Sequence, residues 1–249
     1  MLLSVLTDGV LTLTLNRPDK RNALSAPLLL ALMEGLERAD LDAGVRVVVI
    51  RGSGKDFCAG ADLEELLASA DRSLDENEQA ALTLGNIFLR MRQVPKPIVA
   101  VVHGRALAGG AGLATACDII LAQESARLGY PEIQRGFVPA MVMTMLRRQV
   151  GEKVAFDLAS TGRVLTAAEA QALGLISRYF PDAEFEAGVG EVVRGLIQAS
   201  AAALAFTKKQ FYQLDGMDFE AGIRLGAKVN ALSRATPDFR EAIASFLKR

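Results

Sequence analysis

Histidine and cysteine are rare in this sequence and its net charge is close to zero, and each of these features excludes a class of function. There is one histidine, His103, and no serine or cysteine nucleophile motif accompanies it, so we expect a structural role for it. The two cysteines, Cys58 and Cys117, are too few for a disulfide framework or a zinc cluster, and we expect them to pack among small apolar neighbours. Chemistry without a catalytic histidine usually depends on a carboxylate.

The charge balance gives no broad attraction for nucleic acid. The chain has 28 Lys and Arg against 29 Asp and Glu, a net charge of −1, and no stretch that interleaves basic and aromatic residues. The first six residues have no basic start, and the turn signal Asp8-Gly9 follows almost at once, so neither a secretory signal nor a membrane span is expected. These features favour a cytoplasmic protein without a membrane partner.

Length and composition favour one large domain, or one domain with a helical appendage. Apolar residues make up 51% of the 249 residues, and no Pro-rich or Ser-rich linker interrupts them. Strand and helix signals alternate until about residue 183, after which amphipathic helical stretches remain. We therefore predict an α/β fold, with a β/α core over 1–183 and a helical region over 184–249. Strands are expected at 10–15, 45–50, 98–102, 118–122, 126–129 and 175–180, and helices at 27–39, 63–92 with a charged interruption at 71–78, 142–149, 166–172, 189–199 and 219–234.

Two glycine-rich turns, at 57–62 and 108–112, are the most informative local feature. Each precedes helix-compatible residues, and a helix N-terminus leaves N–H groups unpaired with a favourable dipole behind them. One N–H from each turn could hold a single carbonyl oxygen, which would make an oxyanion hole suited to an acyl thioester. Either cluster alone more often marks a tight turn or close packing, so the hypothesis depends on the pair. Neither cluster matches a phosphate loop or a dinucleotide fingerprint, so no flavin or nicotinamide is expected.

The chain contains four ordered blocks, at 16–18 with 21–24, at 54–63, at 104–110 with 116–118, and at 128–133. Over almost the whole chain, these blocks resemble those of the enoyl-CoA hydratase/isomerase (crotonase) family. The resemblance implies a crotonase-like superhelix of ββα turns with a C-terminal helical trimerisation region, and hence a homotrimer or a dimer of trimers. It also implies an acyl-CoA thioester as the substrate, with coenzyme A as part of that substrate, no separate cofactor and no metal.

The same resemblance implies roles for particular residues. The backbone N–H groups of Ala61 and Gly109 would form the oxyanion hole, which needs an open approach rather than a particular side chain. The main chain around Ala59 would hold the adenine, and Arg21 would either contact a phosphate or simply be solvated. The further positions implied to bind coenzyme A are Ala23, Ala61, Asp62 and Leu63, and the final residues, 246–249, resemble a family segment that approaches coenzyme A, sometimes from a neighbouring subunit.

Glu132 is the predicted acid and base. It lies among apolar residues after Gly129-Tyr130-Pro131, where burial would raise its pKa toward the range useful for proton transfer. Without the family context, an ordinary surface glutamate would be the better interpretation. The apolar candidates for an acyl pocket are Leu63, Leu66, Leu67, Tyr130, Phe137 and Val138.

The chain departs from the family pattern at Gly112, three residues after Gly109, where two-carboxylate hydratases carry a second glutamate. A lone carboxylate suits a 3,2-enoyl-CoA isomerase, in which it moves a proton from C2 to C4. Hydration also needs only one base that activates water and returns the same proton, and the segment 136–140 resembles branches assigned as hydratases. We therefore predict an enoyl-CoA hydratase, with the isomerase and a non-catalytic acyl-CoA binder as alternatives.

Overall fold

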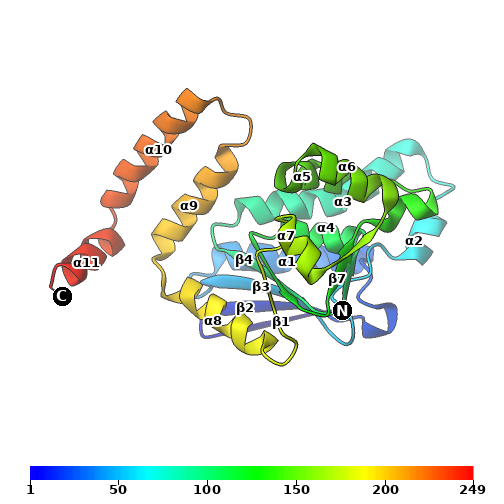
Figure 1. Ribbon diagram of the computed structural model, residues 1–249, viewed down its shortest axis with the longest axis horizontal. Helices are drawn as coiled ribbons and strands as arrows, with labels where there is room; N and C mark the ends of the chain where they lie inside the picture. Colours follow the sequence, from blue (N-terminus) through cyan, green and yellow to red (C-terminus); the bar gives the residue numbers. More distant parts are fainter. Residues whose placement is uncertain (249) are drawn as a thin grey trace.

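A six-stranded sheet forms the centre of the molecule, and helices cover both of its faces (Figure 1). The strand order is β1-β2-β3-β4-β6-β9, and every neighbouring pair except β1–β2 is parallel. The α/β class predicted from the sequence is confirmed. The computed structural model describes residues 1–248. Its strands are β1 (Leu2–Thr7), β2 (Val10–Leu15), β3 (Val47–Gly52), β4 (Ile98–Val102), β5 (Arg105–Leu107), β6 (Ile119–Gln123), β7 (Arg127–Gly129), β8 (Val164–Thr166) and β9 (Arg178–Phe180).

Helices fill the connections between the strands and make up the whole C-terminal part. They are the short 3₁₀ helices η1 (Pro18–Lys20) and η2 (Pro131–Arg135), and the α-helices α1 (Ala26–Leu41), α2 (Leu63–Ala68), α3 (Leu74–Gln93), α4 (Gly109–Ala116), α5 (Ala140–Val150), α6 (Glu152–Thr161), α7 (Ala167–Ala172), α8 (Phe185–Gln198), α9 (Ala201–Gln213), α10 (Phe219–Arg234) and α11 (Pro237–Phe246).

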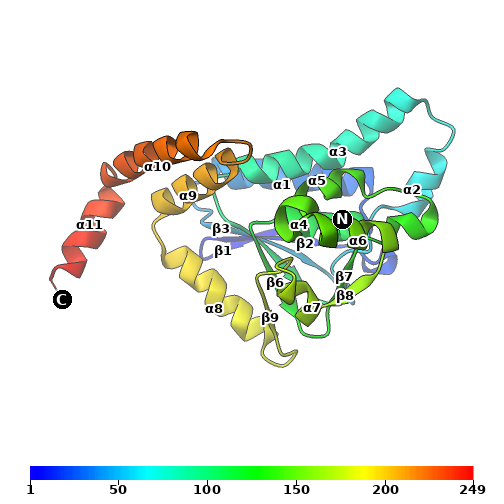
Figure 2. The same cartoon turned by 45° about the horizontal axis from the view of Figure 1, so that its top comes forward.

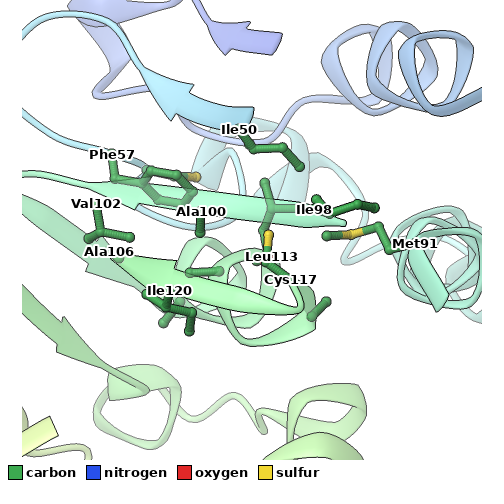
Figure 3. Close-up of a cluster of buried hydrophobic side chains, with 14 of the residues drawn as sticks. Ile50, Phe57, Met91, Ile98, Ala100, Val102, Ala106, Leu113, Cys117 and Ile120 are labelled. Atoms are coloured by element: carbon green, nitrogen blue, oxygen red, sulfur yellow. The ribbon is translucent and has the colours of Figure 1, made fainter. Parts of the chain in front are cut away.

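The strand sequences explain why the sheet is covered on two sides. The central strands β3 and β4 are apolar on both faces, as expected of parallel strands inside a layered fold. On one face, side chains such as Ile50, Ile98 and Ile120 meet Met91 of α3 and Leu113 of α4 (Figure 3). On the other face, α8 packs on β3, β6 and β9 and lies on the opposite side of the sheet from α1 and α3 (Figure 2). The residues of this second core include Val47, Val49, Val99, Val101, Leu121, Phe185, Val189 and Val193.

A second, three-stranded sheet with the order β5-β7-β8 lies beside the first. β5 and β7 are parallel, and their register places Ala106 opposite Leu128. An isolated parallel bridge places Cys58 opposite Ala106, and another places Leu24 opposite Ala61. Four segments that are far apart in the sequence, around Leu24, Cys58, Ala106 and Leu128, are therefore joined side by side.

The helix predicted over 63–92 is two helices, and the charged interruption is a break. α2 ends at Ala68, and Ser73 starts α3 with a capping box, in which its side chain and that of Glu76 each bond the other's backbone N–H. The strand predicted over 175–180 is confined to Arg178–Phe180, because a turn at Gly174 directs Leu175 and Ile176 back onto α7, where both N–H groups donate to the Ala170 carbonyl. The α-helix α6 was not predicted.

The last three helices project from the body of the molecule (Figure 1). Only α9 is firmly attached, through the buried Lys208, whose Nζ lies 2.7 Å from Asp118 Oδ2 and donates to the Lys96 carbonyl. No residue of α10 or α11 is buried. Within residues 1–248 no single helix has the length and hydropathy needed to cross a bilayer, although α8 and α9 pass that test as a pair bent by 101°. Large exposed apolar side chains on this arm include Phe219, Ile223, Leu232, Ile243 and Phe246.

Candidate active site

Three parallel segments end at the same edge and bring the predicted chemistry together. Cys58, Ala106 and Leu128 lie side by side in register. Ala61 and Gly109 each follow by three residues, and Glu132 follows by four. Because the carboxyl ends of neighbouring parallel strands meet at one edge, the predicted donors and the predicted acid/base lie around one site. Sequence reasoning singled out these three residues, and the structure brings them together.

The two predicted oxyanion donors are adjacent and unpaired. Among the hydrogen bonds of residues 1–248, neither the Ala61 nor the Gly109 N–H has an acceptor. A Cβ built on Gly109 would lie 3.7 Å from the Ala61 nitrogen, and one on Gly60 would lie 3.4 Å from the Gly109 nitrogen. The backbone between them is strained, since Ala108 has a φ of +51°. Two unpaired N–H groups on adjacent turns, one at the start of α4, can donate to one oxygen atom.

Gly110 allows α4 to approach the first turn so closely. A Cβ at this position would lie 2.4 Å from the Cys58 carbonyl oxygen and 2.7 Å from its Sγ, which backbone atoms cannot accommodate. Cys58 itself is fully buried, and this burial raises the pKa of its thiol to about 12. Cys58 therefore packs rather than reacts, as the sequence predicts.

Glu132 has the properties of a general acid and base. It lies in η2 and is 7% exposed, and its Oε2 atom is buried with no hydrogen-bond partner. Burial raises the pKa of its carboxyl above the ordinary value, and the positive charge of Arg135 acts weakly in the opposite direction. A buried carboxyl oxygen without a partner is costly for folding alone, which is typical of a group kept for chemistry. Among residues 1–248 no cluster of His, Cys, Asp or Glu suits a metal ion.

The lone histidine lies beside the first turn rather than in the site. Its Nε2 atom is 3.0 Å from the Gly54 carbonyl oxygen, and its Nδ1 has no partner. It follows β4 at the start of the connection into β5. This placement agrees with the predicted structural role of His103.

Apolar side chains fill the space that a second carboxylate would need. A Cβ on Gly112 would lie 2.6 Å from Val142 Cγ2 on α5 and 3.4 Å from Phe88 Cζ on α3. The turn that carries Gly112 is therefore packed against two apolar helices, and no glutamate fits there without a shift of Val142. Among the described residues Asp62, next to Ala61, is also buried, but its carboxyl is paired with Arg17, whereas Glu132 has a buried carboxyl oxygen without a partner.

The segment predicted to hold coenzyme A is organised by an ion pair that sequence reasoning missed. Arg17 Nη2 lies 2.8 Å from Asp62 Oδ2, and Arg17 Nη1 donates to the Ala23 carbonyl at 2.6 Å. The Asp62 side chain also caps α2, and the hydrogen bond from Arg17 lowers the pKa of its carboxyl. The predicted contact residue Asp62 thus has its side chain committed to Arg17. The sequence places Arg17 in a family block without revealing this partner.

The other predicted coenzyme A positions surround this ion pair. Arg21 is exposed, with its Nε 3.8 Å from Asp56 Oδ2, so its guanidinium faces solvent with room for a further anion. The Ala59 N–H donates to the Arg21 carbonyl, which places Ala59 beside Arg21. Ala23 is buried and Leu63 is exposed at the start of α2. Phe246 ends α11 at the far end of the molecule from α2 (Figure 1), and Arg249 lies outside the described residues.

The predicted acyl-pocket residues are only partly placed at the site. Tyr130 was wrongly assigned to the pocket wall, because it is fully buried and its hydroxyl hydrogen-bonds Thr115. Leu24 and Leu84 do lie at the site, since their side chains come within 3.6 Å of a Cβ built on Gly109, yet their spacing in the sequence gave no signal. Of the other predicted pocket residues, Leu66 is half-buried, and Leu63, Leu67, Phe137 and Val138 are exposed.

Comparison with known proteins agrees with this geometry. Residues 6–249 match the family model for enoyl-CoA hydratase/isomerase. The 2,3-dehydroadipyl-CoA hydratase of Escherichia coli is 37% identical over 242 residues, covering 96% of this chain and 92% of that protein. A Thermus thermophilus protein, provisionally named an enoyl-CoA hydratase, is 43% identical over 94% of this chain and 93% of its own. The crystal structure of an enoyl-CoA hydratase from Mycobacterium smegmatis superposes with a TM-score of 0.95 at 34% identity, covering 99% of this chain and 96% of that one.

The chain belongs to the enoyl-CoA hydratase/isomerase family. It has the crotonase fold and is an enzyme of the kind to which its relatives belong, which act on acyl-CoA thioesters.

Proposed function

We propose that this protein is an enoyl-CoA hydratase that adds water across the 2,3 double bond of an enoyl-CoA thioester. The observation that carries the proposal is the buried Oε2 atom of Glu132, which has no partner and lies at the same strand edge as the unpaired N–H groups of Ala61 and Gly109. Addition of water to a conjugated thioester needs at least one carboxyl that can accept and return a proton, and two fixed hydrogen-bond donors.

In the proposed reaction the thioester oxygen accepts hydrogen bonds from the Ala61 and Gly109 N–H groups. The Glu132 carboxylate takes a proton from water, and the hydroxide oxygen forms a bond to C3 while negative charge moves onto the thioester oxygen. The two N–H groups stabilise that charge without having to reorient. The carboxyl then returns the proton to C2, so that one water molecule has been added and Glu132 is again a carboxylate.

We further propose that the segments 17–23 and 59–63 hold the coenzyme A part of the substrate. Arg21 supplies a cation whose one carboxylate neighbour within residues 1–248, Asp56, is 3.8 Å away, and the Arg17–Asp62 pair fixes the backbone beside it. No other cofactor takes part in this scheme. A homotrimer, or a dimer of trimers, would cover the apolar arm formed by α10 and α11.

A 3,2-enoyl-CoA isomerase is the second candidate, and the packing of Gly112 favours it. Because Val142 excludes a second carboxylate, Glu132 alone would take a proton from C2 and return it to C4. The oxyanion hole would serve both reactions equally. The products distinguish them, since hydration removes a conjugated double bond and isomerisation of a 3-enoyl thioester creates one.

The test follows the absorbance of the conjugated thioester with crotonyl-CoA and, in parallel, with 2,3-dehydroadipyl-CoA. Wild-type protein is expected to lower the absorbance, and Glu132→Gln, which keeps the shape but loses the titrating group, is expected to slow the reaction by about 10²- to 10⁴-fold. Glu78→Gln on the exposed face of α3 is the matched control and should react at the wild-type rate. An absorbance that is unchanged with both substrates but rises with a 3-enoyl-CoA would replace the hydratase by the isomerase.

A further inference from the structure

A pair of buried hydroxyl groups joins the segment that carries Glu132 to the helix that begins at Gly109. Tyr130 Oη lies 2.7 Å from Thr115 Oγ1, and Thr115 Oγ1 lies 2.7 Å from the Ala111 carbonyl oxygen. A threonine hydroxyl has one hydrogen to donate. Since the Ala111 carbonyl can only accept, Thr115 donates to Ala111 and accepts from Tyr130. Both side chains are at most 1% exposed, so water does not compete for either bond.

The two hydroxyls belong to the two elements that carry the chemistry. Tyr130 immediately precedes η2 and stands two residues before Glu132. Thr115 lies in α4, whose first residue is Gly109, and α5 is tied to the same point by Gln149 Nε2, which donates to the Thr115 carbonyl at 2.9 Å. The Tyr130–Thr115 bond is thus a side-chain link between the acid/base segment and the oxyanion helix.

We propose that Tyr130 and Thr115 are positioning residues, whose hydrogen bond fixes the Glu132 carboxyl at its working distance from the Gly109 N–H. The inference rests on the proposed use of Glu132 and the two N–H donors, and it deepens that function. Neither residue touches the reacting atoms.

The carboxyl needs such a support because little else holds it. Its Oε2 atom makes no hydrogen bond, so its place depends on the segment that carries it. That segment is a 3₁₀ helix of five residues, a geometry that is weak by itself. η2 itself is also held by backbone bonds from the Phe137 N–H to the Glu132 carbonyl and from the Gly136 N–H to the Ile133 carbonyl, and by a 3.2 Å bond from Gln134 to the Gly162 carbonyl. The backbone bond that reaches α4, from the Ala108 N–H to the Gly129 carbonyl at 2.9 Å, holds the end of β7 before Tyr130 and not η2. A small displacement of a reacting group is costly in rate.

Three variants separate positioning from packing. Tyr130→Phe removes the hydroxyl alone. Thr115→Val removes the acceptor and leaves the buried Tyr130 hydroxyl unsatisfied. The double variant, Tyr130→Phe with Thr115→Val, leaves no unsatisfied group and should regain much of the stability lost in Thr115→Val. Thr115→Ser keeps the hydroxyl and serves as the conservative rescue. Tyr212→Phe is the matched control, because it removes another tyrosine hydroxyl, one that donates to Asp118 at 2.7 Å away from the site.

The readout is exchange of the C2 protons of butyryl-CoA in D₂O, followed by mass spectrometry, together with thermal unfolding of each variant. This exchange needs Glu132 to take a proton from C2 and the oxyanion donors to hold the enolate, but it needs no addition of water. Tyr130→Phe and Thr115→Val are expected to lower the kcat of exchange about ten-fold with KM changed less than about two-fold. The double variant should be more stable than Thr115→Val but should exchange C2 protons no faster than Thr115→Val. Thr115→Ser and Tyr212→Phe should exchange at the wild-type rate.

Wild-type exchange rates in Tyr130→Phe and Thr115→Val, or a double variant whose rate recovers with its stability, would overturn the inference. Exchange by the wild type without hydration of any enoyl-CoA would remove the proposed hydratase activity, and the same variants would still decide the positioning role. A wild-type protein that hydrates crotonyl-CoA but exchanges no C2 proton would overturn the transfer of the C2 proton by Glu132 and, with it, the positioning role.

Discussion

At the scale of single residues, the proposed reaction makes Glu132 the group that sets the pH range of activity. Burial raises the pKa of its carboxyl, and the neighbouring Arg135 lowers it. The proposed reaction starts from the carboxylate, so kcat/KM should fall as the pH drops through the raised pKa, at a higher pH than an exposed glutamate would give. Replacing Arg135 by Gln removes the opposing charge and should move this acid limb to higher pH.

The measurement is kcat/KM for crotonyl-CoA from pH 4.5 to 9 for the wild type and Arg135→Gln. Arg147→Gln, which removes a similarly exposed arginine on α5, is the control and should keep the wild-type limb. An acid limb that stays in place in Arg135→Gln would mean that another group titrates. The stability changes with pH in the opposite direction: because the pKa of Glu132 is raised in the folded state, its protonation contributes stability that is fully present below the pKa of the unfolded chain and is lost as the pH rises through the raised pKa.

Some site residues follow from the sequence and others do not, and the difference is physical. Ala61 and Gly109 can be recognised because a backbone donor needs only a turn, a small residue and a following helix, all of which are local. Arg17, Leu24 and Leu84 act through partners 45, 37 and 25 positions away in the chain, at Asp62, Ala61 and Gly109, so no window of sequence shows them. Tyr130 was misplaced because the direction of a residue that follows a strand depends on the register of that strand.

At the scale of secondary-structure elements, the contact of α4 with α5 excludes a second carboxylate. A methyl group at position 112 would lie 2.6 Å from Val142 Cγ2, and the χ1 angle of a helical valine is stiff. Gly112→Ala is therefore expected to lower the free energy of unfolding by about 1–3 kcal/mol. Val142→Ala removes the obstructing methyl, so the double variant should lose less than the sum of the two single variants.

Chemical denaturation of the four proteins measures this coupling. Gly190→Ala on α8 is the control for adding a methyl to a helical glycine, because nothing lies within 4 Å of its Cβ position. Strict additivity of Gly112→Ala and Val142→Ala would show that the two positions do not touch. The four-protein cycle would then contradict the account given for the missing glutamate.

Element boundaries were predictable where the signal was local. The strands around 98–102 and 118–122 are continuous apolar runs bounded by polar residues, and they form as expected. The separation of α2 from α3 depends on a capping box at Ser73 and Glu76, which competes with helix continuation. Gly174 ends α7 with a φ of +78° and shortens the following strand. The periodicity of apolar residues does not predict such competition between local hydrogen bonds and those that would continue the helix.

At the scale of the whole molecule, the arm formed by α10 and α11 is too apolar to remain uncovered. Phe219 and Ile223 are 86% and 60% exposed on α10. If the arm packs on neighbouring copies, as the proposed trimer requires, Phe219→Ser with Ile223→Ser should convert the oligomer to single chains of 26.6 kDa. Sedimentation and light scattering measure the mass directly.

Lys228→Ser, which removes an exposed charge from the same helix, is the control and should leave the mass unchanged. A wild type of 26.6 kDa at micromolar concentration would refute the trimer. The helical character of this region could be predicted from amphipathic spacing. Its projection from the body could not, because the apolar stripe of a helix indicates that something covers it but not which chain supplies the cover.

The parallel register of Cys58, Ala106 and Leu128 has a consequence for how the enzyme can change. In the proposed reaction both groups that hold the thioester oxygen belong to the main chain, so a substitution of a side chain elsewhere does not remove them. Amino-acid substitutions can replace the acid/base side chain and the apolar side chains around the substrate. A lineage, or a directed-evolution experiment, can therefore exchange the reaction performed on the bound thioester while its activation stays intact, so this scaffold is a suitable starting point for new thioester chemistry.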